Sequence, residues 1–364
     1  MKMNTLFKTL LTVLTILLGL LHSSGQEKLK ETFAKNIPLV MQEQNVPGTA
    51  IAIIENGKVI LKENYGFGDN TLKTALTEST GFNIGSISKT FTAWGILHLA
   101  ESGEIKLDSP ISDYLKTWKL PESTFNASKV TVRNLLQHTA GLSVHGYGGY
   151  ESKDELSSIQ ISLNGTSNSD EKVSLIMEPE TEWKYSGGGY SVLQLLIEEV
   201  SGESFAEYMN EAVFKPLGMH NTSFTISTAI IKNSAKAYDK EGNEIALRLF
   251  NAQAAAGLHT TLEDFILFVK ASFNDNAIVS KKSVDLMMQP TELSRGNYGM
   301  GYMVMNRFGN VTLTGHGGSN KGWQSGFMLD TKTNSGIIIL TNGSGGRNII
   351  FKGIQDWVQW HTQE

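Results

Sequence analysis

Apolar and polar positions follow two different periods along the chain, and these periods divide it into regions. Apolar residues recur at helical spacing over 27–45, and a Pro-Gly pair at 47–48 ends that pattern. Two short β-rich runs follow at 49–54 and 59–65, and the Asn-Gly turn between them predicts a hairpin. The pattern therefore predicts a helix followed by two antiparallel strands.

Helical spacing dominates the middle of the chain. A helix is predicted over 86–100, and Gly103 is a suitable stop for it. From about 105 to 290 helical patterns alternate with loops, and no repeat period is present. The segment 143–170 is rich in Gly, Ser and Asn, which predicts a long surface loop. The clearest further helices are at 130–136, 191–200 and 204–214.

Strand patterns return near the end of the chain, at 300–305, 311–314, 324–329 and 336–340. An amphipathic helix is predicted after them, at 349–360. Strands at both ends with helices between them predict an α+β fold, in which an antiparallel sheet of five or more strands is flanked by helices and carries an inserted, mainly helical domain. We assign the α/β part to about 26–85 and 295–364 and the helical part to about 86–294, and expect the active site in the cleft between them.

The first 25 residues differ from the rest of the chain. Lys2 and Lys8 are their only charged side chains, residues 10–21 form an apolar run, and small residues follow at 23–25. This is the plan of a cleaved secretory signal, and the run is shorter than the ~20 residues of a membrane span. We expect an exported protein, periplasmic or secreted, without a membrane anchor after cleavage; an uncleaved N-terminal anchor is the alternative.

Composition narrows the class of protein. The chain has no cysteine, which excludes disulfides and thiol lipidation. Its 31 basic and 36 acidic residues leave a net charge of −5, which offers no basic surface for nucleic acid. A hydrophobic content of 40% with 36 glycines is typical of a globular enzyme with many loops. We treat residues 26–364 as one catalytic domain.

Ser86 and Lys89 form an S-x-x-K pattern at the start of a predicted helix. On a helix the two side chains share a face, and backbone N–H groups at a helix start can stabilise an oxyanion. An unperturbed lysine has a pKa of about 10.4, so burial must lower that pKa before the amine can act as a base. In the alternative interpretation Ser86 caps the helix and Lys89 is a surface cation. Ser169 and Lys172 match the same pattern in a predicted solvated loop.

A second cluster spans residues 180–190 and includes Tyr185 before three glycines, of which Gly187 is the first. Tyr185 could relay a proton if nearby cations lower its pKa. Alternatively, Trp183, Tyr185 and Tyr190 are core aromatics around a helix start.

A third cluster, residues 314–323, follows a short predicted strand. His316 could bind a carboxylate, donate a proton or help to hold Tyr185 ionised, and Gly317 and Gly318 would let a substrate approach the backbone. The alternative is a β-turn with an exposed imidazole. No metal-ligand spacing occurs among the eight histidines, and phosphate-loop, dinucleotide and G-x-S-x-G patterns are absent.

In order and separation, the three clusters resemble the serine β-lactamase and penicillin-binding-protein-like superfamily, in the branch of class C β-lactamases, D-alanyl-D-alanine carboxypeptidases and esterases. The resemblance covers roughly 30 to 360 and includes residues 135–142, 195–202 and 255–261.

That resemblance implies an acyl-serine cycle without a metal or organic cofactor. Ser86 would be the nucleophile, Lys89 and Tyr185 would exchange its proton, and either could activate water for deacylation. The backbone N–H groups of Ser86 and Ser319 would form the oxyanion hole. The implied substrate-binding positions are His316, Gly317, Gly318 and Gly187.

The chain departs from the family pattern at two positions. The Y-x-N motif reads Tyr-Ser-Gly at 185–187, and we treat the literal Y-x-N at 208–210 as a coincidence inside a predicted helix. The K-T-G motif reads His-Gly-Gly at 316–318, which replaces a permanent cation with a mostly neutral group. Both changes weaken recognition of the amide and carboxylate of a β-lactam.

We therefore predict an exported serine hydrolase for an ester or amide, D-Ala-peptidase-like or carboxylesterase-like. Its partner is a small-molecule or peptide substrate, with peptidoglycan-derived peptides and β-lactams among the candidates, and not nucleic acid. The alternatives are a class C-like β-lactamase and a slow-turnover penicillin-binding or cell-wall-binding protein.

Overall fold

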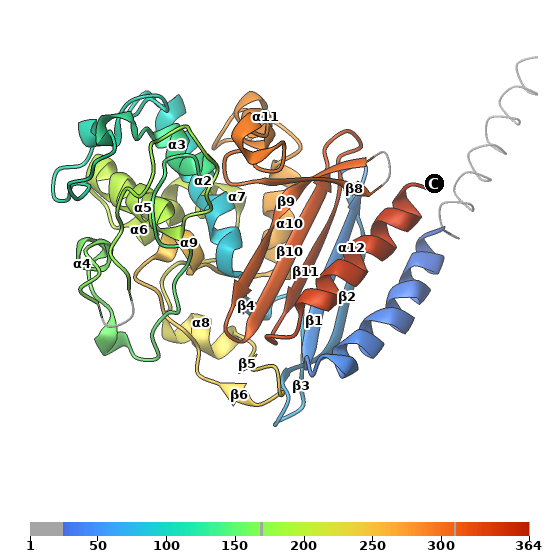
Figure 1. Cartoon of the computed structure of the whole chain (residues 1–364). Helices are drawn as coiled ribbons and strands as arrows, with labels where there is room; N and C mark the ends of the chain where they lie inside the picture. Colours follow the sequence, from blue (N-terminus) through green and yellow to red (C-terminus); the bar gives the residue numbers. More distant parts are fainter. Residues whose placement is uncertain (1–24, 168–169, 309–310, 364) are drawn as a thin grey trace, which may run out of the picture.

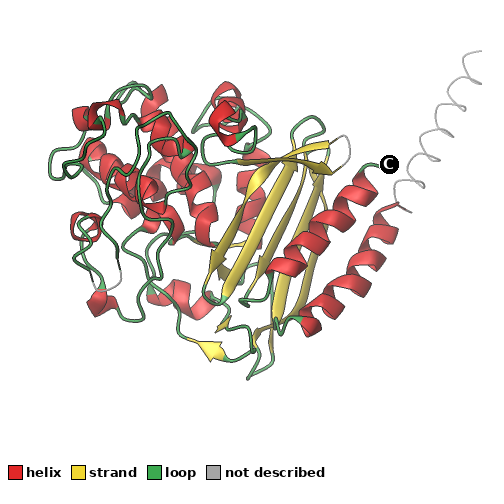
Figure 2. Cartoon of the chain, in the orientation of Figure 1, coloured by secondary structure: helices red, strands yellow, loops and turns green. Residues whose placement is uncertain are grey.

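A seven-stranded antiparallel sheet is the centre of the computed structural model, which describes residues 25–167, 170–308 and 311–363 (Figure 1). The strand order is β3-β2-β1-β11-β10-β9-β8. The predicted α+β class, with a sheet built from both chain ends and flanked by helices, is confirmed (Figure 2). The strands are β1 Gly48–Glu55, β2 Lys58–Asp69, β3 Thr74–Ala75, β8 Met303–Phe308, β9 Val311–Asn320, β10 Trp323–Asp330 and β11 Ser335–Thr341.

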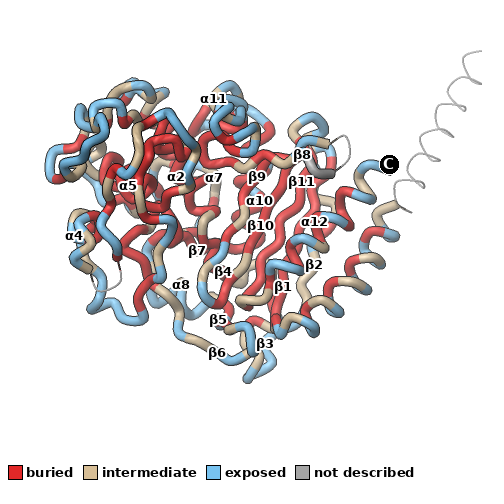
Figure 3. Tube along the Cα trace, viewed as in Figure 1, coloured by how far each residue is buried: buried red, intermediate tan, exposed pale blue. Residues whose placement is uncertain are grey.

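The central strands β1 and β11 join the two ends of the chain. They pair antiparallel, with Thr49 opposite Thr341. Successive side chains of a strand point to opposite faces, and here both faces are buried. Ala50 and Ala52 pack into the larger core that continues into the helical part, whereas Ile51 packs into a smaller core under the terminal helices. Figure 3 shows these strands as the buried middle of the molecule.

The two terminal helices cover one face of the sheet. The helix at residues 25–43 and α12 (Arg347–His361) lie side by side in Figure 1. Asn36 Nδ2 of the first donates a hydrogen bond to Asp356 Oδ2 of the second at 2.8 Å. The opposite face is covered by α10 (Leu262–Ala271), which contacts β1 and β11.

The middle of the chain, between β4 (Gly81–Asn83) and β8 in sequence, is mainly helical and lies to one side of the sheet (Figure 2). Its helices are α2 Ser88–Glu101, α3 Val132–Gln137, α4 Ile159–Leu163, α5 Gly187–Ser201, α6 Phe205–Met209, α7 Lys215–Leu217, α8 Thr228–Asn233, α9 Gln253–Ala256 and α11 Lys281–Met288. Shorter turns are the 3-10 helices Gly85–Ile87, Ile111–Asp113, Ala127–Lys129, Lys153–Glu155 and Glu292–Ser294, and the π-helical η5 Asn210–Phe214. Two small antiparallel pairs are β4 Gly81–Asn83 with β7 His259–Thr261 and β5 Ala237–Tyr238 with β6 Glu244–Ile245.

Several sequence-based expectations differ from the structure in detail. The loop predicted at 143–170 contains α4, because Ile159 and Leu163 pack into the larger core. The strand predicted at 311–314 continues to Asn320, because its pairing with β10 extends through the glycines. Residues 1–24, which hold nearly all of the predicted export signal, lie outside the described residues. The division into an α/β part and a helical part stays a prediction. No helix among the described residues is long and apolar enough to cross a membrane.

Glu55 ties the end of β1 to the last turn of α12. Its buried carboxylate accepts hydrogen bonds from Trp357 Nε1 at 2.8 Å and Ser335 Oγ at 2.8 Å, and lies 3.0 Å from His361 Nδ1. The other imidazole nitrogen of His361 is 3.1 Å from Asp330 Oδ2. The two carboxylates raise the pKa of His361 above its usual 6.5.

We expect the His361→Gln variant to lose a pH-dependent share of stability. The raised pKa means that protonated His361 stabilises the fold fully below pH 6.5, and that this stabilisation fades as pH rises through the folded-state pKa. The advantage of the wild type over the variant should be on the order of 1 kcal/mol below pH 6.5 and should shrink as pH rises through the folded-state pKa. Urea unfolding of both proteins across this range measures the difference, and a constant difference would contradict the assignment.

Candidate active site

Ser86 lies between β4 and α2, in the 3-10 turn Gly85–Ile87. Asn83 Oδ1 accepts the Gly85 N–H at 3.0 Å, and Ser88 Oγ donates to the Gly85 carbonyl at 2.6 Å, so the turn is held from both sides. Neither this turn nor α2 has a side-chain cap, so Ser86 does not act as a helix cap. It is half-buried in a turn whose other residues are buried.

Lys89 is buried in the first turn of α2 with its amine beside Ser86. Its Nζ lies 3.4 Å from Ser86 Oγ and donates to the Ala255 carbonyl at 2.7 Å. The same nitrogen lies 4.9 Å from the ring centroid of Tyr185 and 5.6 Å from that of Tyr190. Burial lowers the pKa of Lys89 to about 7, so much of the amine is neutral near physiological pH. The alternative of a surface cation is therefore wrong.

Tyr185 precedes Ser186, the N-cap of α5. Ser186 Oγ accepts the Gly189 N–H at 2.9 Å, so the three glycines form the first helical turn and not a separate loop. Burial raises the pKa of Tyr185, and its hydrogen bond with Ser86 only partly opposes this. The condition under which the sequence analysis allowed a relay, a pKa lowered by nearby cations, is therefore not met. Tyr185 is a neutral phenol that can donate and accept a proton.

His316 lies inside β9 and is fully buried. Its Nδ1 is 2.6 Å from the Gly317 carbonyl, and its Nε2 is 3.2 Å from the Tyr298 hydroxyl. Burial, together with the charge of Lys89, lowers the pKa of His316 to about 3. The imidazole is therefore neutral, in agreement with the mostly neutral group that the sequence analysis expected here, and the alternative of a β-turn with an exposed imidazole is wrong. Its ring centroid lies 6.4 Å from that of Tyr185.

Glycines bring β9 against the turn that carries Ser86. A Cβ atom on Gly318 would lie 1.9 Å from the Ile84 carbonyl oxygen, and one on Gly85, at φ +52°, would lie 2.7 Å from Ser319 N. Distances this short exclude any side chain at either position. The structure thus brings the backbone of Gly317, Gly318 and Ser319 beside the Ser86 turn, and the N–H groups of Ser86 and Ser319 are those that the family resemblance implies for an oxyanion hole.

Gly187 packs against the loop that precedes α4. Its N–H donates to the His145 carbonyl at 3.1 Å, and a Cβ on Gly187 would lie 3.0 Å from that oxygen and 3.4 Å from the Tyr147 ring. The loop thus occupies the space that a side chain at this position would need. This packing gives a physical reason for glycine in place of the asparagine of Y-x-N.

Three residues of the site were missed by the sequence analysis. Ala255 provides the carbonyl that binds Lys89, while His138 and Tyr298 lie between Tyr185 and His316. His138 ends α3 with φ +59°, and its ring centroid is 4.3 Å from that of Tyr185. His138 and Ala255 lie in the segments 135–142 and 255–261 that carry the family resemblance, but the sequence analysis gave neither a role, and no signal marks Tyr298.

The coincidental motifs lie elsewhere. Tyr208 belongs to α6, and its hydroxyl donates to the Gly95 carbonyl in the core at 3.1 Å. Ser169 lies outside the described residues.

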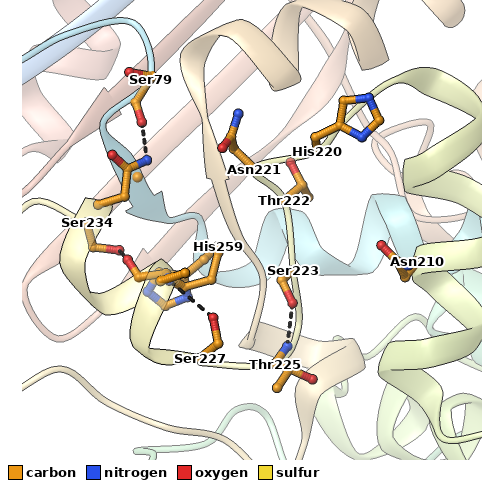
Figure 4. A pocket seen from close by; sticks show the side chains of 14 residues that line it. Ser79, Asn210, His220, Asn221, Thr222, Ser223, Thr225, Ser227, Ser234 and His259 are labelled. Atoms are coloured by element: carbon orange, nitrogen blue, oxygen red, sulfur yellow. Dashed lines mark hydrogen bonds between the residues drawn. The ribbon is translucent and has the colours of Figure 1, made fainter.

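A cavity of about 570 Å³ lies between α8 and the β4–β7 pair (Figure 4). It is lined by Ser79, Thr222, Ser223 and His259 among others, and by none of the predicted site residues. Among the described residues no group of three or more His, Cys, Asp or Glu side chains could hold a metal ion.

Comparison with known proteins identifies a family profile and several curated relatives that match most of the chain. The Beta-lactamase family profile matches residues 33–350. Protein flp of Staphylococcus aureus (strain NCTC 8325 / PS 47) is 28% identical over 310 residues, which cover 83% of this chain and 61% of flp. PbpX of Bacillus subtilis (strain 168), named as a penicillin-binding protein, is 30% identical over 270 residues, which cover 72% of this chain and 63% of PbpX. The chain thus spans less than two thirds of either curated relative.

A solved structure is similar over most of the chain. The octameric penicillin-binding protein homologue from Pyrococcus abyssi matches with a TM-score of 0.75 and 27% identity, and the match covers 93% of this chain and 76% of that one. The fold of this chain is therefore similar to that of a solved penicillin-binding protein homologue over most of its length.

We expect Lys89→Met to abolish activity and to stabilise the fold. Unfolded lysine stays protonated up to its usual pKa of 10.5, whereas the folded protein holds Lys89 at about 7, so burial costs stability that grows as pH falls from 10.5 to 7 and is constant below 7. Methionine removes this cost, and the gain at neutral pH should be about 1–3 kcal/mol, after subtraction of the lost Ala255 contact. Urea unfolding of both proteins checks the sign of the stability change, and a variant less stable than the wild type would contradict the predicted gain. Retained activity would contradict the role of Lys89 as the base.

Proposed function

Because this chain belongs to the beta-lactamase family, we propose that it is an exported serine hydrolase that cleaves an ester or an amide through an acyl-serine intermediate. One observation carries the proposal: the buried Lys89 amine, with its pKa near 7, lies 3.4 Å from Ser86 Oγ. An amine that is partly neutral at physiological pH can take the proton of the attacking hydroxyl. Export rests on the signal-like pattern of residues 1–25.

In the acylation step, Ser86 Oγ attacks the carbonyl carbon of the substrate and gives its proton to the neutral Lys89 amine. A bond forms between Oγ and the acyl carbon while the carbonyl electron pair moves to oxygen. We assign the backbone N–H groups of Ser86 and Ser319 as donors to that oxyanion. When the tetrahedral centre collapses, the alcohol or amine leaves with a proton that Lys89 returns through the Tyr185 hydroxyl.

In the deacylation step, water attacks the acyl carbon and gives its proton to Lys89. The bond between Ser86 Oγ and the acyl carbon breaks, and Oγ regains the proton. We assign Lys89 as the base in both steps, because burial brings its pKa near neutrality and raises that of Tyr185. Tyr185 then acts as a neutral relay that accepts one proton as it donates another.

The chemistry around the nucleophile favours an uncharged acyl substrate. His316 is neutral where the family pattern has lysine, so the charge-assisted hydrogen bond of a lysine to a substrate carboxylate is not available from it. Gly187 has no side-chain amide to bind the acyl-amide group of a substrate, and the His145 carbonyl occupies the space that such a side chain would need. These two features support a carboxylesterase-like activity more directly than a D-Ala-peptidase-like one. They also argue against efficient class C-like β-lactam hydrolysis.

A slow-turnover penicillin-binding role is the second candidate. The names of PbpX and of the Pyrococcus abyssi protein, which describe a penicillin-binding protein and a homologue of one, favour it. The two candidates differ in one quantity, the lifetime of the acyl group on Ser86.

We expect Ser86→Ala to lose p-nitrophenyl ester hydrolysis by at least about 1,000-fold without a change in melting temperature. Intact-mass spectrometry after exposure to the ester, a D-Ala-D-Ala peptide and a penicillin should show any acyl adduct on the wild type and none on the variant. Ser169→Ala is the matched control, because it alters the second S-x-x-K pattern and should keep full activity.

Each outcome selects one candidate. Ester turnover without a stable penicillin adduct supports the hydrolase, and a stable adduct without turnover supports the penicillin-binding role. Nitrocefin hydrolysis faster than ester hydrolysis would instead support the class C-like alternative. Ester hydrolysis by the Ser86→Ala variant at the wild-type rate would refute the acyl-serine mechanism.

A further inference from the structure

A chain of buried hydrogen bonds runs from β9 to the start of α5, and its direction can be read from the groups at its two ends. At the β9 end, the Gly317 carbonyl can only accept, so His316 Nδ1, 2.6 Å away, carries the hydrogen and donates it. A neutral imidazole holds one hydrogen, and His316 Nε2 is therefore an acceptor. Its partner is the Tyr298 hydroxyl at 3.2 Å, which donates to it.

The other end gives the same direction independently. The Ser186 N–H can only donate, and it points at His138 Nδ1 at 3.1 Å, so this nitrogen is an acceptor. His138 then carries its hydrogen on Nε2 and donates it to the Tyr298 oxygen at 3.2 Å. Tyr190 is also a hydrogen-bond partner of Tyr298. Because its own hydroxyl donates to the Leu136 carbonyl at 2.9 Å, it can only accept from Tyr298 and shares the Tyr298 hydrogen with His316 Nε2.

The two ends agree on one arrangement of protons. The order is Ser186 N–H to His138, His138 to Tyr298, Tyr298 to His316, and His316 to the Gly317 carbonyl. All three side chains are at most 2% exposed, so water does not substitute for a missing partner. Burial and the charge of Lys89 hold the pKa of both histidines well below the usual value, which keeps the arrangement neutral.

The chain of bonds connects the parts of the site that have to stay in place during catalysis. Ser186 directly follows Tyr185, and the His138 ring packs on the Tyr185 ring with centroids 4.3 Å apart. At the other end, Gly317 belongs to the segment of β9 that lies against the Ser86 turn. Loss of the central hydroxyl would therefore release Tyr185 on one side and the His316 ring on the other.

We propose that His138 and Tyr298 are positioning residues, which together hold Tyr185 over Lys89 and lock His316 in its Nδ1–H form with Nε2 turned to Tyr298 and not to the substrate. This inference rests on the proposed acyl transfer for its catalytic consequence, but the proton arrangement itself does not depend on it. His316 in this form is a structural acceptor behind the site. Substrates are then selected by shape and by backbone hydrogen bonds at β9, and not by a cation at His316.

Nitrogen-15 NMR of the imidazole groups tests the arrangement directly on the wild-type protein. We expect His316 to carry hydrogen on Nδ1 and His138 on Nε2, and both to stay neutral at about pH 6. The reverse tautomer or an imidazolium at either residue overturns the proposal. This readout needs no substrate, so a failure of the proposed function and a failure of the proton arrangement are seen separately.

Tyr298→Phe removes the central hydroxyl and tests the positioning role. Outer hydrogen-bond partners of a site commonly contribute about 10–100-fold, so we expect kcat for ester hydrolysis to fall by that factor with KM changed less than about threefold. The His316 NMR signal should also lose its fixed tautomer. Tyr302→Phe is the matched control, since Tyr302 is equally buried but bonds to Trp94 Nε1 at 2.9 Å. Equal kcat for both variants, with an unchanged His316 signal, would refute the positioning role.

Two substitutions of His138 test its two hydrogen bonds separately, the one from the Ser186 N–H and the one to Tyr298. In His138→Asn the Oδ1 atom takes the place of Nδ1 and keeps the Ser186 N–H bond, and asparagine tolerates the left-handed backbone there. In His138→Gln the Nε2 atom takes the place of the imidazole Nε2 and keeps the donor to Tyr298. We expect the first to retain more kcat and the second to retain the His316 tautomer. If both lose the two properties equally, His138 has only a packing role.

Discussion

The burial of an amine beside a hydroxyl is the constraint on which the rest of this structure depends. Lys89 sits in the first turn of α2, and loss of solvent is the only cause that lowers its pKa. Burial alone makes the amine a usable base, so the elements around it have to exclude water while leaving Ser86 half-exposed. The rings of Tyr185 and Tyr190 and the carbonyl of Ala255 fulfil this requirement without a carboxylate.

Neutrality of the surroundings follows from the same constraint. A protonated histidine near Lys89 would add a second positive charge to a site that must accept a proton on the amine. His138 and His316 avoid this, because each donates its one hydrogen to a fixed acceptor and is buried. Glycines at 85 and 318 then allow two backbone segments to approach where side chains would collide, and this brings Ser319 N beside the nucleophile turn.

Much of this could be predicted from the sequence, and the part that could not depends on packing. The S-x-x-K pattern identified Ser86 and Lys89, and the alternation of strand and helix patterns predicted the sheet built from both ends. The raised pKa of Tyr185 could not be predicted, because loss of solvent around a ring is decided by elements distant in sequence. His138 and Tyr298 were missed for a related reason: their partners are 160 and 18 positions away, and no local pattern marks a hydrogen bond of that kind.

The pairing of β1 with β11 bears on when this site can exist. Residues 48–55 are made early and remain without their central partner until residues 335–341 follow. Contacts so distant in sequence close late, because the loop entropy between them has to be overcome first. The strand with His316 and Ser319 reaches the Ser86 turn only as part of this closed sheet. A nascent or truncated chain therefore contains Ser86 without the β9 backbone beside it, and the proposed acyl-transfer site is complete only when nearly the whole polypeptide is present.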